Sequence, residues 1–170
     1  MVWVPGEIRG YEMAHKLYGK LPWADLFQPT IKLAKEGIPI SKILHSHTET
    51  IPNLKETQSL RQLFTDENNN LLKTGDIVKF EKLADTLEII ANQGADVFYT
   101  GKIAEDLVQD VKAAGGTLDL EDLASYRVTL TDAWNVSMEE YQVYFPPPPA
   151  GGSLLTLILN IMKGPWWQSC

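Results

Sequence analysis

Three potential metal ligands lie within five residues, at His45, His47 and Glu49. On a β-strand, this i, i+2, i+4 spacing would place all three side chains on one face, where they could hold a zinc ion. On a helix, only His45 and Glu49 would be neighbours, and His47 would point away. The apolar residues Ile43 and Leu44 indicate a helix. We therefore expect a solvated polar helix face and no metal site.

A Ser-His-Asp triad could be assembled from Ser153, His15 and Asp132. Any chain of this size offers such combinations, and a triad is defined by geometry rather than by composition. Gly151 and Gly152 precede Ser153 at the start of an expected helix, where backbone N–H groups could face an anion. Glycines that follow four prolines more often allow a tight turn, so we favour the structural interpretation for both motifs.

Arg9 lies between two acidic residues, Glu7 and Glu12, after a Pro-Gly turn. A surface ion pair with Glu7 would contribute only about 0–1 kcal/mol. If Arg9 is buried, it needs a carboxylate partner, and either acidic residue could provide it. We expect a structural role for this cluster.

Asn135, Val136 and Ser137 form an N-glycosylation sequon, since the middle residue is not proline. Such tripeptides often arise by chance. The sequon matters only if the protein is secreted or faces a lumen, where a glycan on a strand edge or a turn would be tolerated.

The composition is that of one ordinary globular domain: 170 residues, of which 44% are hydrophobic. A net charge of −7 argues against nucleic-acid binding, which requires clustered Lys and Arg. The single cysteine, Cys170, permits no intrachain disulfide and no thiolate metal site. The longest apolar run, residues 154–162, is too short to span a bilayer. The first residues do not resemble a secretory signal, so we expect targeting information to be absent or to lie upstream.

Apolar residues recur at helical spacing over most of the chain. Helices are predicted over residues 8–18, 23–34, 41–64 (weakly, with an interruption at Pro52), 80–91, 103–111 and 154–161, with a short turn over 119–123. Pro29 should break or kink the second helix, because its ring clashes with the preceding turn. Residues 66–70 are predicted to form a polar turn.

After Tyr126 the pattern alternates, which indicates strands through Val128 and Leu130, then Val136 and Met138, and then residues 141–145. Four prolines at 146–149 end the last strand, because proline supplies no ladder donor. The predicted class is α+β, mainly helical, with a small antiparallel β element near the C-terminus. Many amphipathic helices with so few strands suggest that most of the sheet they should pack on is missing.

Several motifs in order resemble the large subunit of γ-glutamyltransferases (glutathione hydrolases). They are VPGEIRGYE (4–12), GKLPW (19–23), LFQPTIKLA (26–34), LADTL (83–87), GADVFYTG (94–101), AAGG (113–116), EDLASY (121–126), PPPPAGG (146–152) and LILNIMKG (157–164). The resemblance runs over nearly the whole chain. We therefore predict a partial large-subunit domain over residues 1–164 and an unrelated tail over residues 165–170.

The resemblance implies an N-terminal-nucleophile (Ntn) hydrolase with an αββα sandwich. In that family a precursor cuts itself, and the new N-terminal Thr of the small subunit attacks a γ-glutamyl amide such as glutathione, with its own α-amine as base. The family's substrate-binding Arg lies upstream of the Pro-Gly-Glu motif, and the Thr lies downstream of the helix over 157–164. The resemblance thus assigns no catalytic, substrate-binding or metal-binding residue to this chain, and no cofactor. The segment Ser46-His47-Thr48 is superficially similar to the family's nucleophile region but lies in the wrong place.

We therefore expect a fragment that is inactive by itself, whose partner would be the small catalytic subunit. An alternative is a non-catalytic interaction module that pairs with a small subunit or a full-length protomer. A further alternative is a metal hydrolase that uses His45, His47 and Glu49. The family is anchored in the plasma membrane and faces outward, whereas no signal or anchor is evident among these residues.

Overall fold

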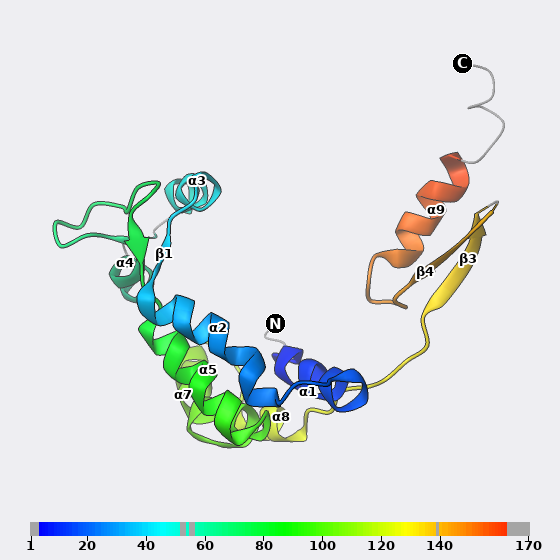
Figure 1. Ribbon diagram of the computed structural model, residues 1–170, viewed down its shortest axis with the longest axis horizontal. Coiled ribbons are helices and arrows are strands. Elements are labelled where there is room, and N and C mark those ends of the chain that lie inside the picture. Colours follow the sequence, from blue (N-terminus) through cyan, green and yellow to red (C-terminus); the bar gives the residue numbers. More distant parts are fainter. Residues whose placement is uncertain (1–3, 52–53, 55–56, 139, 163–170) are drawn as a thin grey trace, which may run out of the picture. The chain divides into compact units, whose positions relative to one another are not determined.

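The computed structural model describes residues 4–51, 54, 57–138 and 140–162. The chain divides into two compact units, residues 1–128 and residues 129–170, and each unit is described by itself. Helices predominate in the first unit, and a β-hairpin followed by a helix makes up the second (Figure 1).

The first unit, called unit 1 below, contains eight helices and two very short strands among its described residues. The helices are α1 (Glu7–Tyr18), α2 (Trp23–Glu36), α3 (Lys42–Thr50), α4 (Gln58–Phe64), α5 (Glu81–Gln93), α6 (Asp96–Thr100), α7 (Lys102–Ala113) and α8 (Leu120–Ser125). Strand β1 (Ile38–Pro39) pairs with β2 (Ile77–Val78) in antiparallel fashion.

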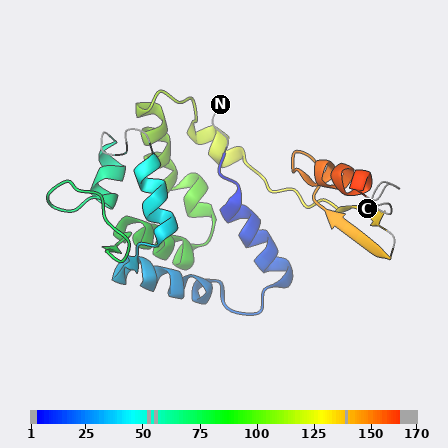
Figure 2. The ribbon, with the colours of Figure 1, turned by 90° about the horizontal axis from the view of Figure 1, so that it is seen from above.

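One core cluster lies between α2 and α5, which run alongside each other in Figures 1 and 2. Ile31 and Ala34 of α2 and Ala84 and Ala91 of α5 are buried there, with Phe27 packed against them. The small side chains allow the two helices to approach closely. Larger residues at these positions would push the helices apart.

The second core cluster joins α6, α7 and α8. Tyr99, Ala104 and Leu123 have no exposed surface, and Ile8 of α1 packs on the cluster from outside. Helix α8 is fixed at its start by a capping box, in which the side chains of Asp119 and Asp122 each accept a backbone N–H. The short turn predicted over residues 119–123 thus corresponds to the capped start of a helix.

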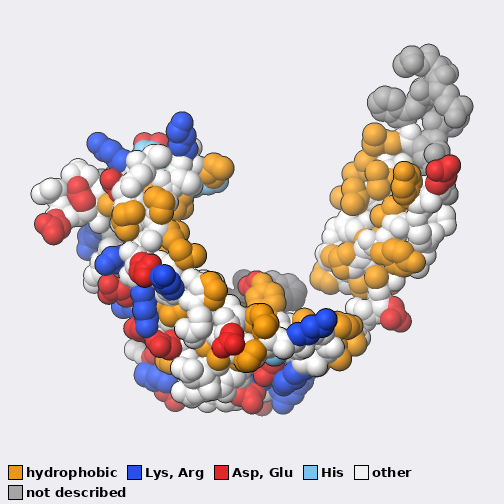
Figure 3. Space-filling view, viewed as in Figure 1, with side chains coloured by type: hydrophobic (Ala, Val, Ile, Leu, Met, Phe, Trp, Pro, Cys, Tyr) orange, Lys and Arg blue, Asp and Glu red, His pale blue; other side chains and the backbone are white. Residues whose placement is uncertain are grey.

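The second unit, called unit 2 below, consists of strands β3 (Trp134–Met138) and β4 (Tyr141–Phe145) and helix α9 (Gly152–Met162). The strands form an antiparallel hairpin in which Val136 lies opposite Val143. Helix α9 has no buried residue, although most of its side chains are apolar. Hydrophobic side chains gather over α9 and the hairpin in Figure 3. A helix that is apolar yet uncovered is typical of an element that belongs inside a larger protein.

Gly152, the first residue of α9, packs directly against the hairpin. A Cβ atom at this position would lie 2.6 Å from Cδ2 of Phe145, which is closer than real Cβ contacts permit. Only glycine therefore fits here. This supports the structural interpretation of Gly151-Gly152-Ser153 as a tight turn into a helix.

The predicted α+β class is confirmed, as are the helices near residues 8–18, 80–91, 103–111 and 154–161. The polar turn is also confirmed, because Asp66 Oδ1 accepts the backbone N–H groups of Asn68 and Asn70 at 2.9 and 2.8 Å. Pro52, Gly164 and the tail over residues 165–170 lie outside the described residues.

The break predicted at Pro29 and the strand predicted through Val128 and Leu130 were wrong. Helix α2 runs through Pro29 to Glu36. Pro29 and Asp25, whose carbonyl loses its helical donor, are both exposed, so water can satisfy that oxygen. Residues 128–130 form no strand, since Leu130 is exposed and no neighbouring strand among the described residues pairs with it.

Candidate functional site

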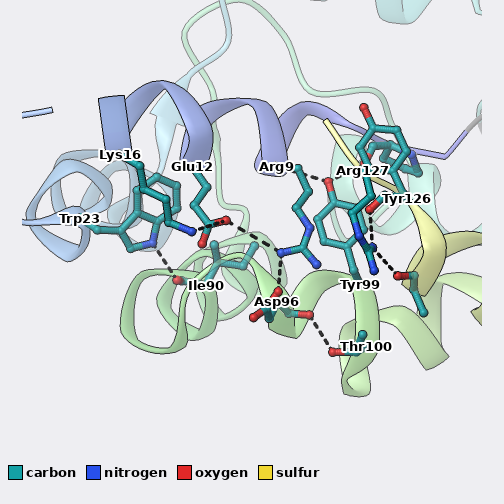
Figure 4. A network of polar contacts seen from close by, with 12 residues as sticks. Arg9, Glu12, Lys16, Trp23, Ile90, Asp96, Tyr99, Thr100, Tyr126 and Arg127 are labelled. Atoms are coloured by element: carbon teal, nitrogen blue, oxygen red, sulfur yellow. Dashed lines mark hydrogen bonds and ion pairs between the residues drawn. The ribbon is translucent and has the colours of Figure 1, made fainter. Parts of the chain in front are cut away.

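The main polar cluster of unit 1 is centred on Arg9, in the first turn of α1 (Figure 4). Its Nη1 donates a hydrogen bond to Oδ1 of Asp96, at the start of α6. The same nitrogen lies 3.9 Å from Oε2 of Glu12, and Lys16 Nζ lies 3.1 Å from that oxygen. The four side chains thus form an alternating chain of charges that ties α1 to α6.

The Tyr99 side chain contacts both the guanidinium group and the backbone of Arg9. Its ring lies 4.5 Å from the guanidinium carbon, and its hydroxyl accepts the Arg9 backbone N–H at 3.2 Å. The same hydroxyl donates to the carbonyl oxygen of Pro5 at 2.7 Å. On the other side the Tyr99 ring stacks on Tyr126, with centroids 5.9 Å apart and planes at 10°. Among the described residues, Arg9 Nε is buried without a hydrogen-bond partner.

The Pro-Gly turn before α1 is required by this packing. A Cβ atom at Gly6 would overlap the hydroxyl group of Tyr126. The glycine therefore allows the chain to pass close to the stacked rings before it enters α1. The segment Pro5-Gly6 thus packs closely against Tyr99 of α6 and against Tyr126, which directly follows α8.

A cavity of about 520 Å³ opens beside this cluster, with Arg9, Lys16, Asp96 and Arg127 in its lining. Arg127 Nη1 donates hydrogen bonds to the carbonyl oxygens of Ala124 and Tyr126, at 2.7 and 2.8 Å. The positively charged side chains that line the cavity therefore already form hydrogen bonds or ion pairs within the protein.

The electrostatics of the cluster do not favour proton transfer near neutral pH. Hydrogen bonding and attraction to Arg9 lower the pKa of Asp96, so that this carboxylate stays ionised. Burial is the main factor that raises the pKa of Tyr99, so that the phenol stays neutral. A general acid or base works best when its pKa lies near the working pH. The cluster is therefore suited to holding helices together rather than to catalysis.

Of the two carboxylates predicted to partner Arg9, Glu12 does so and Glu7 does not. The Glu7 carboxylate instead accepts a hydrogen bond from the Tyr11 hydroxyl, one turn further along α1. Sequence reasoning missed Asp96, the closest partner, because it lies 87 residues away in the chain. The signal available was the segment GADVFYTG, which contains both Asp96 and Tyr99.

His45, His47 and Glu49 lie on helix α3, as the helical interpretation predicted. His45 Nε2 is 3.6 Å from Glu49 Oε1, and its Nδ1 is 3.1 Å from the Leu72 carbonyl oxygen. His47 is exposed. Within the described part of the chain, no group of three His, Cys, Asp or Glu side chains is arranged to hold a metal ion.

Of the three residues considered for a Ser-His-Asp triad, His15 belongs to unit 1. His15 Nε2 lies 2.8 Å from the Leu21 carbonyl oxygen, and this nitrogen is the donor because a carbonyl oxygen can only accept. Ser153 and Asp132 belong to unit 2.

Asn135 and Ser137 of the sequon lie exposed on the same face of β3, because alternate strand residues share a face. Gln142 on β4 bridges them: its amide nitrogen donates to Asn135 Oδ1, and its oxygen accepts from Ser137 Oγ at 2.8 Å. Among the described residues, no helix is long and apolar enough to cross a bilayer.

Comparison with known proteins agrees with the resemblance seen in the sequence motifs. The model of the gamma-glutamyltranspeptidase family matches residues 1–168. Rat glutathione hydrolase 5 proenzyme is 44% identical over 163 residues, which make up 95% of this chain and 28% of the relative. The chain thus spans little more than a quarter of that relative's length.

Solved structures agree with the sequence comparison. Helicobacter pylori gamma-glutamyltranspeptidase superposes with a TM-score of 0.85 at 32% identity, over 94% of this chain and 46% of that one. A cephalosporin acylase from Bacillus halodurans gives a TM-score of 0.80 at 28% identity, over 94% of this chain and 31% of the acylase. The architecture is therefore that of the helical part of an Ntn-hydrolase sandwich.

Proposed function

Because the chain belongs to the γ-glutamyltranspeptidase family, we propose that it is the central part of the large subunit of a glutathione hydrolase. The observation that carries this proposal is the 44% identity to rat glutathione hydrolase 5 over almost the whole chain. The lower identity to the cephalosporin acylase, 28%, favours glutathione and related γ-glutamyl compounds over other amides. Fold alone would not distinguish these substrates.

The proposed contribution of this chain to the reaction is a scaffold. In the parent enzyme the N-terminal Thr of the small subunit would attack the γ-glutamyl carbonyl, and water or an acceptor amino acid would release the acyl group. We assign neither the Thr nor the substrate-binding Arg to any position among these 170 residues. The Arg9 cluster supports this assignment, since its charges are paired with one another.

The proposed partner is the small catalytic subunit. Packing of these helices on a sheet from that subunit would account for the apolar helix α9, which has no buried residue in the present chain. It would also supply neighbours for the hairpin of β3 and β4, which forms a two-stranded sheet among the residues that the structure describes. A lone two-stranded hairpin is marginally stable in water.

The same exposed surfaces favour a second candidate function, a non-catalytic module that pairs with a full-length protomer or a small subunit. Leu154, Leu157 and Ile161 of α9 are all roughly half exposed or more. Such apolar surfaces promote association but also aggregation. Co-purification with a full-length relative at a fixed ratio would favour the module, and heterogeneous aggregates would count against it.

We further propose that Asn135 is glycosylated when the protein enters the secretory pathway, and that the parent enzyme faces outward at the plasma membrane. The exposed position of Asn135 on β3 is compatible with a glycan. Expression in a secreting eukaryotic host should give a mass shift that peptide N-glycosidase removes. Asn135→Gln should abolish that shift, whereas Asn160→Gln, outside any sequon, should keep it.

Activity measurement tests the scaffold proposal. The folded chain is expected to release no chromophore from a γ-glutamyl anilide, while an intact relative such as the Helicobacter pylori enzyme does so under the same conditions. Covalent catalysis has no starting point without a nucleophile.

A further inference from the structure

The hairpin of β3 and β4 in unit 2 has one polar face. Its register places Asn135 opposite Tyr144, and Ser137 opposite Gln142. Directly opposite residues of an antiparallel pair share a face, as do alternate residues of one strand, so these four side chains lie together. All four are exposed, and they include both the asparagine and the serine of the glycosylation sequon.

The other face of the hairpin is apolar, and α9 begins against it. Val136 and Val143 lie on this face and are partly buried. Phe145 lies on the same face, and its ring packs against Gly152, the first residue of α9. The polar face is therefore turned away from the start of α9, which leaves room for a large substituent on its side chains.

Gln142 holds the Asn135 carboxamide by its oxygen atom. Gln142 Nε2 donates to Asn135 Oδ1, and Gln142 Oε1 accepts from Ser137 Oγ at 2.8 Å. In N-glycosylation, the asparagine Nδ2 forms a bond to C1 of the first N-acetylglucosamine of a lipid-linked donor. The bond from C1 to the lipid pyrophosphate breaks, and Nδ2 loses one proton. Because Oδ1 takes no part in this exchange, the bond to Gln142 is compatible with an attached sugar.

Tyr144 provides an aromatic surface beside the point of attachment. The Cβ atoms of opposite residues in an antiparallel pair lie about 4.5–5.5 Å apart. Tyr144 is 67% exposed, although its ring is large and substantially apolar. The face of an aromatic ring carries partial negative charge, which attracts the weakly positive C–H groups of a sugar ring. A sugar on Asn135 can therefore cover the Tyr144 ring and remove apolar surface from water.

We propose that the first N-acetylglucosamine carried by Asn135 packs against the ring of Tyr144, so that the polar face of the hairpin is a docking surface for the protein's own glycan. This inference rests on the glycosylation of Asn135 proposed above. Covalent attachment fixes the occupant, because the effective concentration of a group on a short tether reaches the millimolar range. A contact too weak to bind free sugar is thus formed once the sugar is attached.

The test uses the full chain, secreted from a eukaryotic host with isotopically labelled sugars. An endoglycosidase then trims the glycan to the single N-acetylglucosamine on Asn135. Protons that lie over the face of an aromatic ring resonate upfield in NMR spectra. We expect upfield-shifted sugar protons with nuclear Overhauser effects to the Tyr144 ring. Tyr144→Thr should abolish the upfield shift, whereas Tyr144→Phe, which keeps the ring, should retain it.

Tyr141→Thr is the matched control, because Tyr141 is 75% exposed on the same strand but on the apolar face. It should leave the sugar shifts unchanged. Unshifted sugar protons without Overhauser effects to Tyr144 in the parent chain would overturn the proposal, whatever the variants show. Equal upfield shifts in the parent and in Tyr144→Thr would also overturn it.

The same preparation separates this inference from the proposal on which it rests. A glycan on Asn135 without contact to Tyr144 would overturn the docking surface and leave the glycosylation of Asn135 standing. A secreted chain that carries no glycan on Asn135 would overturn both. Mass spectrometry of the secreted chain before trimming distinguishes these two failures.

Discussion

Replacement of Tyr99 by alanine is expected to lower the free energy of unfolding by about 4 kcal/mol, in the range found for large aromatic residues in cores. Tyr99 has no exposed surface, stacks on Tyr126 and supports the Arg9 guanidinium. Its hydroxyl joins Arg9 and Pro5. A domain has only about 5–15 kcal/mol of stability in total, so we expect the variant to be largely unfolded at moderate urea concentrations. Urea unfolding followed by circular dichroism measures the change.

Two variants separate packing from hydrogen bonding at this position. Tyr99→Phe keeps the ring and removes only the hydroxyl, so a loss of about 1–2 kcal/mol is expected. Tyr141→Ala, at an exposed position on β4, should change stability by about 0.5 kcal/mol or less. If Tyr99→Ala were no more destabilising than Tyr99→Phe, the stacked rings would not be central to unit 1.

Replacement of Ala84 by leucine is expected to destabilise the chain by about 3 kcal/mol. Ala84 has no exposed surface and lies where α2 and α5 pack through Ala34, Ala84 and Ala91. A leucine side chain has no room there and must separate the two helices. Thermal unfolding would show the effect as a fall in Tm of several degrees, about 2–8 °C for each kcal/mol depending on the size of the cooperative unit.

The control for overpacking is Asp85→Leu, one residue further along α5 and exposed to solvent. It introduces the same side chain without filling the interface, so its effect should stay within about 0.5 kcal/mol. Similar losses for both variants would indicate a general intolerance of leucine in α5. That result would contradict close packing of α2 on α5.

Local patterns predicted most of the elements of the fold. The helical spacing of Leu83, Leu87 and Ile90 predicted a helix over residues 80–91, and α5 runs from Glu81 to Gln93. Local rules failed where distant parts of the chain decide the outcome. Strands β1 and β2 have only two residues each and exist through a pairing between positions about 40 residues apart, so no periodicity marks them. Pro29 likewise stays in a helix because α2 packs on α5.

The polar cluster around Arg9 likewise shows that local sequence patterns do not reveal contacts between distant parts of the chain. Arg9 and Glu12 are three residues apart, and their proximity could be predicted from helical geometry. Asp96 and Tyr99 approach Arg9 only because α6 folds back against α1, which no local pattern reveals. The family motifs contained all four residues but did not show that they meet. Local motifs are therefore enough to indicate the family, whereas the contacts of this cluster depend on the tertiary fold.

The most direct test of the scaffold account is the hydrolysis of a γ-glutamyl anilide by the purified chain, after circular dichroism has shown its helices to be formed. An intact family member assayed in parallel shows that the conditions support turnover. The account predicts no release of chromophore above the uncatalysed rate, because enzymes owe accelerations of about a millionfold or more to groups that we do not assign to this chain. Turnover that persists at constant specific activity through further purification would contradict it, and would mean that a nucleophile lies among residues to which we assign structural roles.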